Sequence, residues 1–529
     1  MKLPKPPEDD LLPAFCTCVL VVIAILFAVR NVPWHLDDFD QAKQAYNSFQ
    51  IVHTGDWLFQ HTPDGAVAAK PPLAAWISTA LYLMAAGHGW DFAWRAPSFA
   101  AALLVLCTLW RSGTKVFGNN IGGLLAAGAF GLNFFTPRLA TLVRTDMLLA
   151  TFIFFLGWLV FEKLRTAEPW TRREQWITCG LVLAALMTKG PIAYGVLLPG
   201  MLVFSLLAGR HGTNRRIWAG GWPWLAPLLV FGLWVSYGYA SIPDFHKVVV
   251  EKEFMGRWTT GADAVHHNQW PGFYTLNLLG KAFPWSLLFV IIFSVKKVRA
   301  ALRENPVLLW LACWTFGGLV FMECVPSKRF DRIFPIVPPA CLLLAAAARY
   351  LPNCEWKRQP TGRLAILCTV LGVALAGGYA GWEISKDFTN DARTLVKFGA
   401  EINDTVKDQH DRLAVVAARD EGLLLYSNHE RFTALDDALR MWKFGRIDWV
   451  VIGEDYFAKV SAKLPPFEIL ATTPPTPGKA NSYRFLKRLP HPQKAEPPPG
   501  TGNLPGPPLP PNPPPGTPAS EAPAKLPAR

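Results

Sequence analysis

Residues 11–29 read LLPAFCTCVLVVIAILFAV, an apolar run that is long enough to cross a lipid bilayer. A membrane-spanning helix needs about 20 consecutive apolar residues. The run has no small-residue cleavage site, so we expect a retained anchor rather than a cleaved signal peptide. It leads directly into a polar, acidic stretch, residues 34–72, which ends in Lys70-Pro71-Pro72. The sequence therefore begins with a membrane anchor followed by an acidic segment at the membrane surface.

Long apolar segments recur along most of the chain. Of its 529 residues 51% are hydrophobic and only 17% are charged, which excludes an ordinary soluble protein. Ten further segments are apolar and long enough, or nearly so, to span a bilayer: residues 96–112, 121–135, 146–161, 175–187, 190–209, 222–240, 271–295, 307–324, 333–349 and 364–382. We expect a polytopic α-helical membrane protein with eleven spans.

The basic residues lie in short loops between these segments. The net charge of +13 therefore indicates membrane topology rather than a nucleic-acid partner. Residues 73–86 form a short apolar segment that either spans the bilayer or lies in its interface. With the interfacial placement, all basic turns fall on one side, as the positive-inside rule requires: residues 111–115, 162–173, 210–216, 296–303 and 349–363. This choice puts the N-terminus in the cytoplasm and the C-terminus outside.

The composition changes after residue 383. Residues 384–488 are predicted to form a small α/β domain, with a helix over 391–406 and strands at 413–418, 448–453 and 483–488, the last of them closing the sheet. Residues 489–529 form a Pro-rich tail that cannot bury a core and should be extended and disordered. The nine cysteines are scattered and none follows residue 368, so no disulfide framework is expected in the α/β domain.

The acidic stretch holds the first candidate functional residues, Asp37, Asp38 and Asp40. Carboxylates gathered at the water-facing end of a membrane span are costly unless they react with or bind something. Structural alternatives remain open. Asp40 could cap a helix over residues 41–50, and Lys70 could be an interfacial lysine whose ammonium reaches water. Asp146 could form a structural ion pair with Arg144.

Several motifs on the predicted outer face occur together in a fixed order. They are Asp40-Gln41-Ala42-Lys43, His53-Thr54-Gly55-Asp56-Trp57, Lys70-Pro71-Pro72, Arg144-Thr145-Asp146, Met187-Thr188-Lys189-Gly190-Pro191, Glu253-Phe254-Met255-Gly256-Arg257, His267 with Phe273-Tyr274, Phe283-Pro284-Trp285, and Ser327-Lys328 followed by Pro335. In this ordered set the chain resembles the polyprenyl-phosphate-dependent glycosyltransferases of GT-C fold, the group of aminoarabinose transferases and protein mannosyltransferases. It is most similar to the bacterial lipid A aminoarabinose transferases.

The resemblance implies a multi-pass protein of the bacterial inner membrane. Residues 1–383 would be the GT-C transmembrane catalytic domain, with its periplasmic catalytic loop at 31–72, and residues 384–488 would be a soluble periplasmic domain. The implied reaction moves a sugar from a polyprenyl phosphate to a hydroxyl of a lipid A-like lipid or a protein, with inversion at the anomeric carbon. Membrane lipids are expected around the spans.

The resemblance also implies roles for single residues. A lipid phosphate is already a good leaving group, so catalysis needs a carboxylate to take a proton and cations to hold the phosphate. Asp40 would be the general base, and Asp146 would position the acceptor. The family usually has Asp-Glu where this chain has Asp40-Gln41, so Asp37 or Asp38 could replace the missing carboxylate. The expected phosphate ligands are Lys70, Arg257 and Lys328, with Lys189, Arg332 and His267 as weaker candidates.

Two points concern the site's composition. Asp331-Arg332 stands where the family commonly has an aromatic residue, which adds charge at the expected phosphate site. Asp40 and Asp146 carry the oxygen ligands that a divalent metal uses, so a metal cofactor held by them is an open alternative.

Two other classes of function remain as alternatives. A transporter or flippase of lipid-linked sugars would use the acidic loop as a gate, but transporters commonly have internal repeats and charges near the membrane midplane, which we do not find in this sequence. A scaffold that docks a partner is favoured only by the Pro-rich tail.

Overall fold

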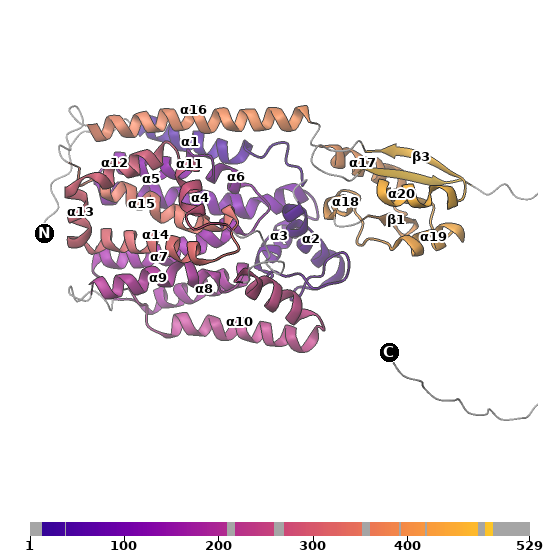
Figure 1. Cartoon of the computed structure of the whole chain (residues 1–529), viewed down its shortest axis with the longest axis horizontal. Coiled ribbons are helices and arrows are strands. Elements are labelled where there is room, and N and C mark those ends of the chain that lie inside the picture. Colours follow the sequence, from indigo (N-terminus) through magenta and orange to yellow (C-terminus); the bar gives the residue numbers. More distant parts are fainter. Residues whose placement is uncertain are drawn as a thin grey trace, which may run out of the picture.

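A computed structural model describes residues 13–36, 39–208, 217–258, 269–351, 360–390, 393–417, 420–473 and 482–489. Most of these residues form a bundle of helices that run roughly along the long axis of the molecule, and a small sheet lies beyond one end of the bundle (Figure 1). The Pro-rich tail, residues 490–529, lies outside the described residues.

Within the described residues, six helices are long and apolar enough to cross a membrane, judged by length and composition. They are α4 (Trp90–Phe117), α7 (Asp146–Thr166), α10 (Trp222–Ser241), α14 (Pro306–Cys324), η5 (Phe330–Ile336) continued by α15 (Val337–Ala348), and α16 (Pro360–Thr389). Shorter or less apolar helices of the bundle are α1 (Pro13–Val29), α5 (Asn120–Gly131), α8 (Arg172–Lys189) and α9 (Ile192–Ala208). The expected multi-helix membrane fold is confirmed.

The segment 271–295, predicted as one continuous span, is broken. It forms α11 (Phe273–Lys281) and α12 (Trp285–Ser294), whose axes meet at 111°. Pro284 stands at the junction, and proline cannot donate the backbone hydrogen bond that a continuous helix needs there. If this bent pair counts as one span, the described residues contain seven candidate spans.

Small residues let neighbouring helices approach closely. A Cβ atom at Gly200 of α9 would lie 2.7 Å from the carbonyl oxygen of Cys313 in α14, and one at Gly113 of α4 would lie 2.3 Å from that of Gly122 in α5. Glycine at such contacts is typical of membrane helices, which gain stability from packing rather than from hiding apolar surface.

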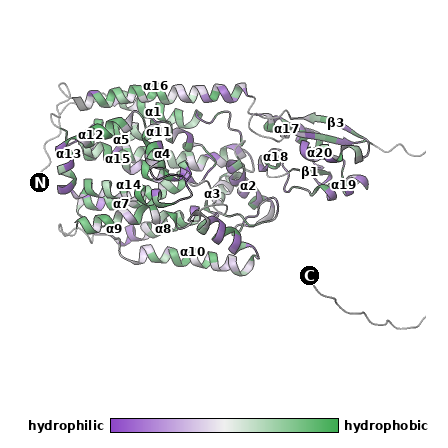
Figure 2. Cartoon of the chain, viewed as in Figure 1, coloured by the Kyte–Doolittle hydropathy of each residue, from purple (hydrophilic) through white to green (hydrophobic). Residues whose placement is uncertain are grey.

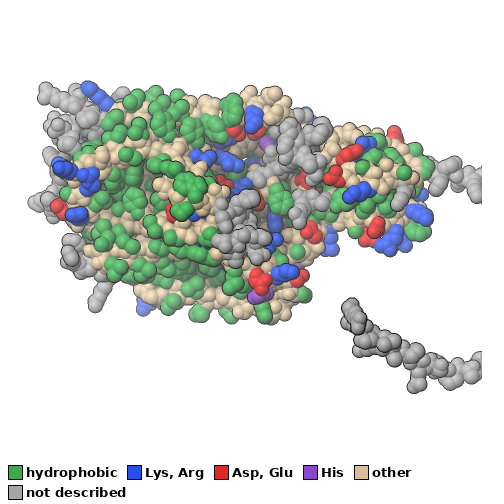
Figure 3. Space-filling view, in the orientation of Figure 1, with side chains coloured by type: hydrophobic (Ala, Val, Ile, Leu, Met, Phe, Trp, Pro, Cys, Tyr) green, Lys and Arg blue, Asp and Glu red, His purple; other side chains and the backbone are tan. Residues whose placement is uncertain are grey.

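The bundle's outer surface is apolar, whereas the sheet end is polar (Figures 2 and 3). On α10, the side chains of Leu225, Leu229 and Leu233 are 62%, 71% and 71% exposed. Large exposed apolar patches of this kind indicate contact with lipid.

Short helices lie at both ends of the bundle. The polar helix α2 (Phe39–Thr54) and the apolar helix α3 (Leu73–Met84) lie at the sheet end, and the basic helix α13 (Lys296–Glu304) lies at the other (Figure 1). The remaining short helices are α6 (Thr136–Ala140), η3 (His246–Phe254) and η4 (Met255–Arg257). α13 contains the basic sequence KKVRAALRE, and the cytoplasmic placement of its end stays a prediction.

The C-terminal part contains a four-stranded mixed sheet. Its elements are α17 (Thr394–Val406), η7 (His410–Arg412), β1 (Leu413–Val416), α18 (Glu421–Tyr426), α19 (Leu435–Lys443), β2 (Trp449–Gly453), α20 (Glu454–Val460), η8 (Ser461–Lys463), β3 (Phe467–Thr472) and β4 (Tyr483–Arg488). The strand order is β1-β2-β4-β3, with β1 and β2 parallel and the other neighbours antiparallel. In the central register, Val451 of β2 pairs with Val415 on one side and Phe485 on the other.

The predicted helix and three strands of this part are confirmed, with two differences. β4, expected to close the sheet, lies inside it between β2 and β3. β3 was not predicted, although Phe467, Ile469 and Ala471 alternate with other residues at strand spacing. α16 continues to Thr389, across the boundary placed after residue 383, and the domain limits stay a prediction.

α2 connects the bundle and the sheet. Its residues Ala42, Tyr46 and Phe49 share one apolar core with Leu423 of α18 and Val451 of β2. On the opposite side of α2, Trp94 of α4 donates a hydrogen bond to Ser48 Oγ at 2.9 Å, and Thr79 of α3 donates one to the Ser48 carbonyl at 3.3 Å. Helix α2 is therefore held both by the C-terminal part and by the bundle.

Candidate active site

Asp40 lies in the first turn of α2, one residue after the helix begins at Phe39. It is not the helix cap that the sequence left open, because its carboxylate faces two arginines. The neighbouring Gln41 is buried, and its Oε1 accepts a hydrogen bond of 3.1 Å from the backbone N–H of Val143. Gln41, in the position of the family's second carboxylate, thus ties α2 to the loop that precedes α7.

Two arginines and two aspartates form a compact cluster around Asp40. Arg329 donates a hydrogen bond to Asp40 Oδ2, and Arg144 Nη2 lies 3.7 Å from the same oxygen. Arg144 also donates a hydrogen bond to Asp331, and Arg329 Nε lies 3.5 Å from Asp331 Oδ2. Asp331, which departs from the family pattern, therefore neutralises part of the charge of both arginines.

The electrostatics of this cluster keep Asp40 ionised. Burial alone would raise the pKa of Asp40, but the positive charges of Lys70, Arg329 and Arg144 outweigh it and lower the pKa to about 2. The carboxylate is therefore charged at every physiological pH. An acid with so low a pKa accepts a proton poorly until its cationic partners are drawn elsewhere.

Lys70 lies in the loop between α2 and α3 and belongs to the same group of charges. Burial lowers the pKa of Lys70 to about 8, with a smaller lowering contribution from Lys189. Glu253, Asp40 and Asp146 oppose this shift. A buried lysine among these charges still carries its proton below about pH 8 and can pair with an anion there.

Asp146 and Lys189 form a second, more deeply buried pair. Asp146 is the first residue of α7 and Lys189 is the last residue of α8, and they are 6% and 9% exposed. Lys189 donates a hydrogen bond to the Asp146 carboxylate. The alternative pairing of Asp146 with Arg144 is replaced by this contact, because Arg144 turns toward Asp331 and Asp40.

An apolar groove of about 430 Å³ begins at Lys189. It runs along α9, and its lining includes Leu198 and Leu202 of that helix, Phe254 at the end of η3 and Phe321 of α14. The lining thus combines apolar side chains with one lysine, whose ammonium is paired with Asp146.

Lys328 and Arg332, both expected near the phosphate, have other contacts. Lys328 Nζ donates hydrogen bonds to the carbonyls of Gln269 and Trp270 at 3.3 and 3.4 Å and lies 3.8 Å from Glu323 Oε2. Arg332 Nη1 donates a hydrogen bond of 2.9 Å to the carbonyl of Ser327. Their proposed phosphate contacts stay predictions.

Four other candidates have no described side chain. Asp37, Asp38 and His267 lie outside the described residues. Arg257 ends η4, but its side chain is not described.

The cluster contains two functional candidates that the sequence analysis did not assign. Arg329 occupies the place beside Asp40 that a phosphate-binding cation would need, and it directly follows the motif residue Lys328. Arg144 stands in the Arg144-Thr145-Asp146 motif, but its partner could not be chosen from the sequence. The only sequence signal for these two arginines was their position in or next to a motif.

The residues do not fit a divalent metal. The Asp40 carboxylate is paired with arginines and that of Asp146 with Lys189. Among the described residues, no group of three or more His, Cys, Asp or Glu side chains is placed to hold an ion. A metal site needs several such oxygen or nitrogen ligands, so we derive no step through a metal.

Comparison with known proteins finds similarity to glycosyltransferases both in sequence and in fold. Residues 69–237 match the family model of dolichyl-phosphate-mannose-protein mannosyltransferases. The chain is 26% identical over 347 residues to undecaprenyl phosphate-alpha-4-amino-4-deoxy-L-arabinose arabinosyl transferase 2 of Proteus mirabilis. The matched residues are 65% of this chain and 60% of the relative. The corresponding transferase of Pectobacterium carotovorum is 24% identical, with 64% and 60% covered. The chain thus matches about three fifths of the length of these curated relatives.

Solved structures share the fold over more of the chain. The crystal structure of ArnT from Cupriavidus metallidurans bound to undecaprenyl phosphate superimposes with a TM-score of 0.70 at 16% identity, covering 90% of this chain and 98% of that one. The archaeal oligosaccharyltransferase AglB from Archaeoglobus fulgidus gives a TM-score of 0.50 at 10% identity, covering 83% and 69%. The predicted resemblance to the GT-C glycosyltransferases is confirmed.

Proposed function

Because this chain has the GT-C fold and the family's motifs in order, we propose that it is an integral-membrane glycosyltransferase. Its donor is a sugar linked to a polyprenyl phosphate, as the names of the relatives and the ligand of the ArnT structure suggest. Its acceptor is a hydroxyl of a lipid A-like lipid or a protein. The observation that carries the proposal is the ionised Asp40, surrounded by Lys70, Arg144 and Arg329, near the Asp146–Lys189 pair.

The residues divide the reaction between a base and cations. Asp40 takes the proton of the acceptor hydroxyl. The oxygen of that hydroxyl forms the new bond to the anomeric carbon. The bond from that carbon to the phosphate oxygen breaks, and the polyprenyl phosphate leaves with the electron pair. Lys70, Arg144 and Arg329 stabilise the charge on the departing phosphate. Displacement from the opposite side inverts the anomeric centre.

Donor binding would also activate the base. In the described structure the arginines lower the pKa of Asp40, which makes it a weak proton acceptor. A donor phosphate competes for the same guanidinium groups and adds negative charge beside the carboxylate. Both effects raise the pKa of Asp40, so its basicity increases when the donor is in place.

The groove that starts at Lys189 is the proposed path of the donor's hydrocarbon chain. Its walls are apolar side chains of α9, η3 and α14, and Leu202 is 55% exposed on its lining. Lys189 joins this groove to Asp146 and hence to the charged cluster.

The proposed location is the bacterial inner membrane, with the catalytic cluster and the C-terminal sheet on the periplasmic side. Two features of the fold support this orientation. Helix α2, which carries Asp40, and the sheet lie at one end of the bundle, and the basic helix α13 lies at the other (Figure 1).

The test is transfer by the purified full-length protein in liposomes that contain an undecaprenyl-phosphate-linked sugar and a glycolipid acceptor. We expect the wild type to transfer the sugar and Asp40→Asn to lose about 10²–10⁴-fold in kcat, the usual contribution of a general base. Native mass spectrometry should still find the donor bound to Asp40→Asn. The matched control Asp436→Asn removes an exposed carboxylate of α19 and should keep full activity.

Equal kcat for Asp40→Asn and wild type would overturn the assignment of the base. Absence of transfer by the wild type, together with movement of the lipid-linked sugar between the two leaflets, would replace the enzyme by the transporter alternative.

A further inference from the structure

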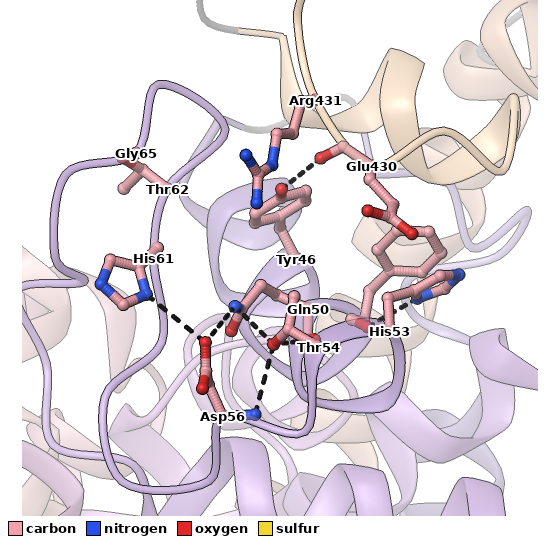
Figure 4. A pocket seen from close by; sticks show the side chains of 11 residues that line it. Tyr46, Gln50, His53, Thr54, Asp56, His61, Thr62, Gly65, Glu430 and Arg431 are labelled. Carbon is pink, nitrogen blue, oxygen red and sulfur yellow. Dashed lines mark hydrogen bonds and ion pairs between the residues drawn. The ribbon is translucent and has the colours of Figure 1, made fainter. Parts of the chain in front are cut away.

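The motif His53-Thr54-Gly55-Asp56-Trp57 has no part in the reaction described above, yet it borders a pocket. The motif lies at the C-terminal end of α2, and the pocket has a volume of about 290 Å³. One wall is formed by His61, Thr62 and Gly65 of the loop after α2 (Figure 4). The opposite wall is formed by Glu430 and Arg431 of the C-terminal part. Two parts of the chain that are far apart in sequence thus build one cavity.

The pocket is lined mostly by polar groups. Asp56 accepts a hydrogen bond of 3.4 Å from Gln50 and lies 3.9 Å from His61 Nδ1 (Figure 4). Tyr46 donates a hydrogen bond to the carbonyl of Glu430, which fixes the C-terminal part against α2. Tyr46 and Phe49, both buried, supply the apolar wall.

Gln50 of α2 orders the end of the helix beside this wall. Gln50 is 6% exposed, and its Nε2 is bonded to Thr54 and Asp56. Its Oε1 has no hydrogen-bond partner among the described residues. Buried polar atoms in proteins are almost always hydrogen-bonded, but this oxygen is enclosed by protein and does not open into the pocket, so the polar groups that face a ligand are those of Asp56, Glu430 and Arg431.

The charges of the lining select the class of ligand. Asp56 and Glu430 carry two negative charges against the single positive charge of Arg431. This balance favours hydroxyl and ammonium groups, which donate to carboxylates, and disfavours phosphate. The volume lies at the lower end of the roughly 300–1,000 Å³ range of small-molecule sites, which suits one sugar ring.

The position of the pocket separates it from the reacting centre. Gln50 and Thr54 lie ten and fourteen residues after Asp40 on the same helix. With a rise of about 1.5 Å per residue, this places them roughly 15–20 Å from the catalytic carboxylate. A sugar in the pocket is therefore neither the transferred sugar nor the carrier of the attacking hydroxyl.

We propose that this pocket binds a neutral or amino-substituted sugar ring of the acceptor, remote from the hydroxyl that is glycosylated. That the ring belongs to the acceptor rests on the proposed function, whereas the sugar site itself does not. Binding at the junction of α2 and the C-terminal part gives that part a role in acceptor selection.

The first test is binding without catalysis. Saturation-transfer difference NMR on the full-length protein in nanodiscs would use methyl α-D-glucoside, glucosamine and glucose 6-phosphate as probes. We expect the first two to bind and glucose 6-phosphate to bind more weakly. Asp56→Asn and Glu430→Gln should each weaken binding about tenfold, as expected for loss of a hydrogen bond to a charged group.

Two control variants locate the signal. Asp64→Asn removes an exposed carboxylate from the same loop without altering the pocket lining, and it should leave sugar binding unchanged. Asp40→Asn should also leave it unchanged, because the pocket is remote from the catalytic cluster. The proposal is overturned if no probe binds, if glucose 6-phosphate binds most tightly, or if Asp56→Asn binds sugars as well as the wild type.

The second test addresses the acceptor. In the transfer assay, Asp56→Asn should raise the acceptor KM about tenfold and leave kcat within about twofold, and an acceptor without its remote sugar should be insensitive to the substitution. An unchanged KM would overturn the acceptor assignment. If the wild type binds sugars in a manner dependent on Asp56 but transfers nothing, the proposed function and the acceptor assignment fail while the sugar site stands.

Discussion

Arg329 donates a hydrogen bond to the carboxylate of Asp40, although the two residues are 289 positions apart in the chain. The contact joins the segment before η5 to the first turn of α2, and Arg144 approaches the same carboxylate at 3.7 Å. These arginines hold Asp40 ionised in the described structure and are the groups that a donor phosphate would compete for. The relationship therefore links donor binding to the basicity of Asp40.

The first prediction concerns the pH dependence of activity. Arg329→Gln removes one of the charges that lower the pKa of Asp40 from its ordinary value to about 2. The pKa of Asp40 rises in the variant, so the carboxylate becomes protonated at a higher pH. We expect the acidic limb of kcat/KM, which lies near pH 2 in the wild type, to move upward by on the order of 1–3 pH units, measured between pH 2 and 7.

The donor is the same for both proteins, so its own titration cancels in this comparison. Arg446→Gln, an exposed arginine of the C-terminal part, serves as the control and should keep the wild-type profile. Superimposable acidic limbs for Arg329→Gln and wild type would show that Arg329 does not govern Asp40.

The second prediction concerns donor affinity at alkaline pH. Burial lowers the pKa of Lys70 to about 8, so its positive charge is present below that pH and is lost as the pH rises through it. If Lys70 holds the phosphate, the Kd for undecaprenyl phosphate should increase above pH 8, by up to about tenfold per unit. Lys70→Arg should abolish this increase, because arginine stays charged.

Lys297→Arg makes the same exchange on α13, at the opposite end of the bundle, and should leave the alkaline loss in place. A wild-type Kd that is constant from pH 7 to 9.5 would argue against Lys70 as a phosphate ligand.

The third prediction concerns stability. Lys189→Met leaves the Asp146 carboxylate buried without the cation that now neutralises it, and breaking a buried ion pair costs about 3–5 kcal/mol. We expect a large drop in Tm of the detergent-solubilised protein. The double variant with Asp146→Asn should recover much of it, because the uncompensated charge is gone.

An exposed ion pair provides the comparison. Arg440 of α19 is paired with Asp437, and their side chains are 72% and 53% exposed. Arg440→Met should change the free energy of unfolding by about 0–1 kcal/mol. If Lys189→Met were equally mild, the Asp146–Lys189 pair would contribute little to stability.

The fourth prediction concerns the apolar groove. Leu202→Trp places a large ring on the groove lining and should raise the donor KM at least about tenfold for an undecaprenyl donor. A donor with a short isoprenoid chain, which occupies less of the groove, should be affected less.

Leu206→Trp is the matched control, since Leu206 lies one turn further along α9, is 82% exposed and does not line the groove. Equal effects of the two tryptophans, or equal effects on long and short donors, would place the donor chain elsewhere.

The sequence predicted the membrane fold because its evidence is local. A helix can be inferred from an apolar run, and each of the eleven predicted spans contains a helix in the structure. Among the described residues, however, only six helices, or seven with the bent pair, are long and apolar enough to cross a membrane, so the count of eleven spans stays a prediction. Strands β1 and β2 could be found in the same way from short runs rich in β-branched residues. The break in the segment 271–295 was missed, although Lys281 and Pro284 interrupt the apolar run, because composition does not give the change in chain direction.

The motifs also identified Asp40, Lys70, Asp146 and Lys189 as members of one site, and the structure brings their charges together. These residues could be found because the resemblance fixes their positions in the chain. The ion-pair partner of each residue could not be found from the sequence, because an ion pair depends on distance in space and not on order in the chain.

Lys328 and Arg329 show most clearly the difference between what the motif identifies and what the folded chain brings together. The motif pointed to Lys328, whose ammonium contacts the carbonyls of Gln269 and Trp270, whereas the neighbouring Arg329 reaches Asp40. The backbone at Arg329 is extended, with φ −137° and ψ 133°, and successive side chains of an extended segment point in opposite directions. The sequence alone determined the membrane fold and which segments carry the charges. Only the tertiary structure decided which of two adjacent cations faces the carboxylate of Asp40, because that depends on the direction of the chain where it passes α2.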